Sequence, residues 1–101
     1  MVSSCTKERF FTEITGYGTS PISHIKTNED VTIYVKFSAN SPFEYKRYFV
    51  WKIDDAEEFK TESPSIVTIF TTAGEHSVDV WVEYENKDAF GNEFMFPIFV
   101  E

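Results

Sequence analysis

The feature that most constrains this chain is a hydrophobic period of two residues, which recurs along most of its length. Between Val31 and Ala39, apolar residues alternate with polar residues or tyrosine at every position. Successive side chains of a β-strand point to opposite faces of a sheet, so this alternation predicts a half-buried strand. The same signal predicts strands over residues 22–26, 45–53, 66–70, 76–84 and 93–100. Residues 54–60 are acidic and short, and we expect a loop or a short edge strand there.

Composition agrees with an all-β chain. Eleven Phe bring the aromatic content to 18%, and aromatic and β-branched residues suit a pleated, half-buried surface. A length of 101 residues is enough for one core. Several short strands separated by turns predict an antiparallel β-sandwich of about seven strands. We expect a domain over residues 22–101 and an N-terminal tail or tether over residues 1–21, which is rich in Ser, Thr and Gly.

The alternation also predicts which residues face the core. We expect the core to be built from Trp51, Phe37, Val35, Val80 and Val82. Within residues 93–100, one face carries Phe94, Phe96, Ile98 and Val100, and the other carries Met95, Pro97 and Phe99. Because proline has no amide donor, this strand is expected at a sheet edge or with a bulge at Pro97.

The order of these segments resembles a PKD domain, an immunoglobulin-like module. The resemblance covers residues 22–101 and rests on the stretches 48–55, 62–64 and 69–82. It implies that Trp51 fills the space between the sheets, with Pro64 after it and then Phe70, Gly74 and an alternating strand. The family's glycine-aspartate-glycine turn is absent, because Asp54-Asp55-Ala56 stands there.

Charge and cysteine content narrow the function. The net charge is -8, with twelve of the seventeen acidic residues after position 52, so a nucleic-acid partner is not expected. Cys5 is the only cysteine, which rules out an internal disulfide. It lies far in sequence from His24 and His76, so a nucleophilic role is disfavoured. We therefore expect no enzyme activity. We also expect no transmembrane span, because no stretch approaches the 18 or more apolar residues that a span requires.

The residues around Cys5 suggest a lipid anchor. Val2-Ser3-Ser4-Cys5 is similar to the end of a bacterial lipoprotein signal, in which small residues precede the cysteine that becomes lipidated. The resemblance implies a membrane anchor at Cys5 and a domain that faces outward from the membrane. The alternative is a chance match over four residues.

Exposed aromatic residues form the first candidate binding site. We predict outward positions for Trp81, Tyr34 and Tyr84, and a row of aromatic side chains on a sheet face would stack against a surface glycan. The alternative is that Trp81 is covered, either by the N-terminal segment through Phe10 and Phe11 or by a neighbouring domain.

An acidic turn forms the second candidate site. Asp54, Asp55 and Glu57, followed by Glu58, come directly after the strand that carries Trp51. Carboxylate oxygens are the ligands that calcium prefers, so calcium is the one cofactor we consider. The spacing is not that of an EF-hand loop, and a solvated acidic turn is the alternative.

These observations predict a non-catalytic interaction module outside the cell or in the cell envelope, with an adhesion or spacer role. Its expected partner is another protein domain. The alternative is a carbohydrate-binding module of an outer-membrane-anchored surface lipoprotein that uses the exposed aromatic residues.

Overall fold

Strands account for all the regular structure in the described part of the chain. The computed structural model describes residues 12–39, 46–85 and 93–101, and no helix occurs in these ranges. In chain order the strands are β1 (Thr12–Ser20), β2 (Asp30–Ala39), β3 (Arg47–Ile53), β4 (Phe59–Thr61), β5 (Ser65–Ile69), β6 (Gly74–Tyr84) and β7 (Phe94–Val100).

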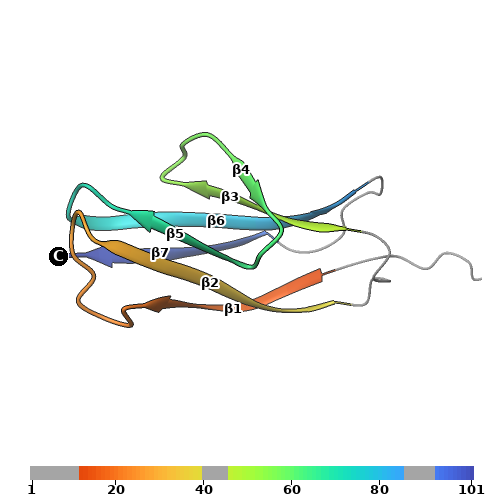
Figure 1. Cartoon of the computed structure of the whole chain (residues 1–101), viewed down its shortest axis with the longest axis horizontal. Helices are drawn as coiled ribbons and strands as arrows, with labels where there is room; N and C mark the ends of the chain where they lie inside the picture. The colour runs from red at the N-terminus through yellow and green to blue at the C-terminus, as the bar shows by residue number, and fades with distance from the viewer. Residues whose placement is uncertain (1–11, 40–45, 86–92) are drawn as a thin grey trace, which may run out of the picture.

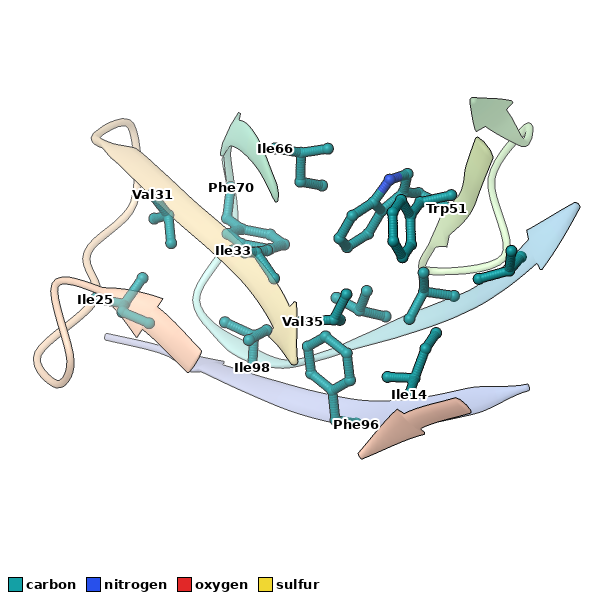
Figure 2. Packing of buried hydrophobic residues seen from close by; sticks show 14 of the residues in the cluster. Ile14, Ile25, Val31, Ile33, Val35, Trp51, Ile66, Phe70, Phe96 and Ile98 are labelled. Atoms are coloured by element: carbon teal, nitrogen blue, oxygen red, sulfur yellow. The ribbon is translucent and has the colours of Figure 1, made fainter. Parts of the chain in front are cut away.

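The seven strands form two antiparallel sheets (Figure 1). One sheet has the order β1-β2-β5 and the other has the order β4-β3-β6-β7. The chain moves from one sheet to the other after β2, after β4 and after β5. Side chains from both sheets point toward one another in the space between them (Figure 2). The predicted all-β, two-sheet sandwich with seven strands is therefore confirmed.

Trp51 lies between the two layers and is fully buried. Its indole N–H donates a hydrogen bond of 2.8 Å to the hydroxyl of Thr61 on β4, so the one polar atom of this side chain keeps a partner inside the fold. Val35, Val80 and Val82 are buried as predicted, and Phe37 is half-buried at the margin of the core.

The predicted faces of the central strands are also confirmed. Val31, Ile33 and Val35 of β2 point to the core, and β6 and β7 alternate in the same way. We call the side of each sheet that points away from the core its outer face. On the outer face of the four-stranded sheet, Val50 is nevertheless fully buried. Its cross-strand neighbours there are Trp81 and Lys60, and both side chains are large enough to cover it.

The N-terminal prediction needs a correction. Residues 12–20, which we placed in a tail, form β1 and pair with β2 along its length. A register shift between Ile14 and Gly16 changes which residues face the core. Thr12 and Ile14 point inward before the bulge, whereas Tyr17 takes the inward position after it. One extra residue therefore breaks the period of two, so the alternation of apolar residues does not indicate this strand.

The first strand predicted over residues 22–26 is also wrong. Only Ile25 makes a bridge there, to Val100 and in a parallel sense. Residues 54–60, expected to form a loop or a short edge strand, contain both: residues 54–58 form no strand, and the edge strand β4 begins at Phe59 and ends at Thr61.

Candidate interaction surface

The aromatic residues predicted to form a glycan platform do not share a surface. Trp81 lies on the outer face of the four-stranded sheet, and Tyr34 lies on the outer face of the other sheet. Tyr84 is only 5% exposed, and its hydroxyl is 2.5 Å from that of Thr12. The outward position of Tyr84 was wrong because the residue has the same parity as Val82 and therefore points to the core.

Trp81 and Tyr34 each pack against their own sheet. Trp81 is half-buried and lies opposite Val50 of the neighbouring strand. Tyr34 is 38% exposed, and its ring lies across Gly18 so closely that a Cβ there would overlap the tyrosine hydroxyl. A side chain at position 18 would therefore require the Tyr34 ring to move. Each aromatic side chain covers its neighbours, and they do not combine into one flat row.

The acidic turn is organised by a histidine. Asp54 and Asp55 both have positive φ angles, of 53° and 59°, in the turn after β3. One carboxylate oxygen of Asp54 lies 2.6 Å from Nδ1 of His76, and the other accepts a hydrogen bond of 2.9 Å from the Ser77 amide. His76 in turn donates from Nε2 to the carbonyl of Thr72 at 2.8 Å. Both Asp54 oxygens are therefore engaged within the protein.

These contacts shift the pKa of both partners. Partial burial acts to raise the pKa of Asp54, but the hydrogen bonds from His76 and the Ser77 amide outweigh it and lower that pKa. The hydrogen bond to Asp54 raises the pKa of His76, against the opposing effect of burial. The contact thus favours the charged form of both partners.

The structure does not bring the predicted calcium ligands together. Asp55, Glu57 and Glu58 are exposed, and Asp54 is turned toward His76. Among the described residues, no group of three or more His, Cys, Asp or Glu side chains is placed to hold a metal ion. Cys5, the predicted lipidation site, lies outside the described residues, as do Phe10 and Phe11.

Strand β7 presents a surface that the sequence only partly indicated. It lies at the edge of the four-stranded sheet, as Pro97 predicted, and pairs with β6. Met95 and Phe99 point away from the core and are 66% and 64% exposed. Both residues flank Pro97 on the same face, so this edge strand carries a row of apolar side chains at its surface.

The register and the hydrogen bonds of Ser77 show which way the backbone groups of β7 point. Ser77, which is opposite Pro97 in the register, donates its amide to Asp54 and accepts from the Asp54 amide at 2.9 Å. Because both polar backbone groups of Ser77 face β3, Ser77 and Pro97 form a non-hydrogen-bonded pair. The backbone groups of Pro97, and by alternation those of Met95 and Phe99, therefore point to the side of β7 that faces away from β6. We call this side the open edge of β7.

The open edge of β7 is occupied at one end only. Ile25 bridges Val100, and its carbonyl accepts a hydrogen bond of 2.7 Å from the Glu101 amide. No other described residue pairs with this side of the strand. A pocket of about 350 Å³ lies beside it, between the end of β7 and Tyr17 and Thr19 of β1, and residues 22–25 close one end. The Tyr17 ring stacks on Phe96 at 4.0 Å.

Acidic groups surround this apolar row. Glu75 and Asp79 of β6 are opposite Phe99 and Met95 in the register, and Glu93 and Glu101 flank the strand in sequence. Burial is the main cause that raises the pKa of Asp79 to about 6, and a hydrogen bond to Glu93 is the second. Lys52 is opposite Asp79 in the register, and Nδ1 of His24 lies 2.7 Å from a carboxylate oxygen of Glu101.

Comparisons with protein-family models, with curated proteins and with solved structures found no match. The described residues contain no helix that is long and apolar enough to cross a membrane. The fold and this surface thus define the chain as a two-sheet β-sandwich with an apolar edge strand.

Proposed function

We propose that this chain is a non-catalytic interaction module of immunoglobulin-like, PKD-like type that binds another protein domain outside the cell or in the cell envelope. The observation that carries the proposal is the pair of exposed apolar side chains, Met95 and Phe99, on an edge strand. Edge strands with apolar surfaces readily pair with other chains, and proteins normally shorten or charge them. A long, uncharged edge beside a pocket is therefore better explained by a partner.

Glycan binding has weaker support. It needs a flat aromatic platform, whereas Trp81 and Tyr34 lie on different sheets and Tyr84 is buried. Titration with a panel of polysaccharides tests this alternative through tryptophan fluorescence, since Trp51 is buried and Trp81 is the half-exposed indole. We expect no change. A saturable shift that Trp81→Phe removes would favour the glycan function.

The protein-binding function is tested by photo-crosslinking in the cells that make the chain. A photoreactive residue replaces Phe99 in one variant and Val67 in another. Val67 is 65% exposed on β5, the edge strand of the other sheet that also exposes Ile69, so it matches Phe99 in exposure and edge position and serves as the control. We expect one discrete protein adduct from position 99 and none from position 67. Equal labelling at both positions, or no protein adduct at position 99, would contradict the proposed function.

The envelope location has a separate test at Cys5. If the lipoprotein resemblance is meaningful, the native product carries acyl mass on Cys5 and fractionates with membranes, because an acyl chain partitions into lipid. A Cys5→Ser variant should then appear in the soluble fraction. A native product without acyl mass would remove the lipid anchor and leave the interaction surface unaffected.

A further inference from the structure

We propose that the open edge of β7 binds an extended segment of a partner protein as an added β-strand, and that this segment carries alternating apolar side chains with Lys or Arg at its ends. This inference rests on the proposed interaction function and specifies its binding mode. Strand addition uses backbone hydrogen bonds for affinity and alternate side chains for specificity.

The backbone of the open edge meets the first requirement. The Met95 and Phe99 amides point away from β6, because Ser77 directs both of its backbone groups to Asp54. Pro97 between them contributes a carbonyl and no donor. An incoming strand would therefore meet the amide donors of Met95 and Phe99, four residues apart, and the carbonyl acceptor of Pro97 between them. Backbone groups on one edge of a strand repeat every two residues, so this spacing suits strand pairing.

The fold already adds one residue to this edge. Ile25 pairs with Val100, and the Glu101 amide donates to the Ile25 carbonyl. The contact shows that the edge accepts an extended backbone at its last residues. A partner segment along Met95 to Phe99 would continue the same row where Ile25 ends.

Side chains of an added strand would meet two different surfaces. Those that point outward would contact Met95 and Phe99. Those that point inward would enter the pocket of about 350 Å³ between Tyr17 and the end of β7. A volume of this size accommodates an aliphatic side chain. A segment with apolar residues at alternate positions can therefore place all of them against one of these two apolar surfaces.

The charges select the ends of the segment and disfavour a second copy of this chain. Glu93 and Glu101 stand at the two ends of β7, and Glu75 and Asp79 lie opposite its exposed side chains. Basic residues that flank the apolar positions would complement this field. Two β7 edges would instead bring these acidic groups close to the same groups of the other copy, and Lys52 and His24 already have acidic neighbours.

The inference is tested with a labelled peptide, Lys-Val-Thr-Val-Thr-Ile-Lys, and two matched controls. The first control is methylated at every second backbone nitrogen, and it is made in both of the two possible alternations. Methylation blocks strand pairing and leaves the charge unchanged. The second control has Glu in place of both Lys residues. We expect saturable binding of the parent peptide in fluorescence anisotropy, and no binding of either control.

Two variants of the protein locate the contact. Met95→Ala removes an exposed side chain and keeps the edge amide, so affinity should fall by about fivefold. Met95→Pro also removes the amide, which makes no hydrogen bond to β6. It should lower affinity by about a further tenfold. Both variants must retain the circular dichroism spectrum of the parent. If Met95→Pro does not fold, the methylated peptide provides the same test from the other side.

Several results would overturn the inference. Equal binding of the methylated peptide would mean that side chains alone mediate contact, and equal binding of the Glu peptide would remove the charge preference. A dimer in sedimentation that Met95→Pro abolishes would assign the edge to a second copy. No peptide binding together with a specific adduct at position 99 would reject strand addition and leave the proposed function standing.

Discussion

The two edges of the four-stranded sheet differ in nearly every property that controls strand pairing. Strand β4 has three residues, and Lys60 at its centre forms an ion pair of 2.9 Å with Glu83. Strand β7 has seven residues and carries no charge. Short length and an exposed lysine are common protections against edge-to-edge association. Among the described residues, the same sheet thus has one short, charged edge and one longer, uncharged edge that is interrupted by the missing donor at Pro97 and covered at one end by Ile25.

Both edges depend on one core, and its loss is the largest effect that we expect. Trp51 is opposite Phe59 of β4 on one side and Val80 of β6 on the other. Trp51→Ala should lower the free energy of unfolding by about 3–5 kcal/mol, since it leaves a large cavity and removes the hydrogen bond from the indole to Thr61. Chemical denaturation measures this change. Retention of the parent midpoint would show that Trp51 does not join the two layers.

The Asp54 contact should have the next largest effect, because it holds the turn after β3 to Ser77 and so orients the backbone beside β7. Asp54→Ala should lower the free energy of unfolding by about 1–2 kcal/mol, a value reduced by the partial exposure of the carboxylate.

The pH dependence identifies the cause of this loss. The raised pKa of His76 gives stability that is complete below 6.5 and is lost as pH rises through the folded value. The lowered pKa of Asp54 gives stability that is present above 3.8 and is lost as pH falls through the folded value. The difference between parent and variant should therefore be largest between pH 3.8 and 6.5. A difference that does not vary with pH would contradict the ion pair.

A smaller effect of opposite sign is expected at Asp79 of β6, which is opposite Met95 of β7. The pKa of Asp79 is raised to about 6 from 3.8, so the folded state binds a proton more tightly than the unfolded state does. Asp79 therefore destabilises the fold increasingly as pH rises from 3.8 to 6. Asp79→Asn should raise the free energy of unfolding at pH 7 by about 1 kcal/mol after allowance for solvent screening. The gain should disappear below pH 4, and destabilisation at pH 7 would contradict this assignment.

The smallest effect on stability comes from giving β7 the protection that β4 already has. Met95→Lys places a charge on an exposed position and should change the free energy of unfolding by less than about 0.5 kcal/mol. It should nevertheless abolish the adduct at position 99 and the binding of the Lys-flanked peptide. Lys60→Met is the reciprocal change at the other edge. A Met95→Lys variant that retains full binding would mean that the exposed face of β7 is not the contact surface.

The period of two was sufficient to predict most strands and the burial of Trp51, because it reflects which face of a strand is wet. It failed for β1, since the bulge at Ile14 to Gly16 shifts the pattern by one residue. Pro97 correctly predicted an edge strand because a missing donor is visible in the sequence. The contact between Ile25 and Val100 and the one between Asp54 and Ser77 were not predictable, because they join segments that are distant in sequence.

Hydrogen exchange at β7 is the most direct test of the account, because the central claim is that one side of this strand is unpaired. The amides of Phe96 and Ile98 face β6 and should exchange slowly, near the rate set by global unfolding. The Met95 and Phe99 amides should exchange orders of magnitude faster in the free protein and become protected when the Lys-flanked peptide binds. Slow exchange of Met95 and Phe99 in the free protein would show that the edge is already covered, and would contradict the account.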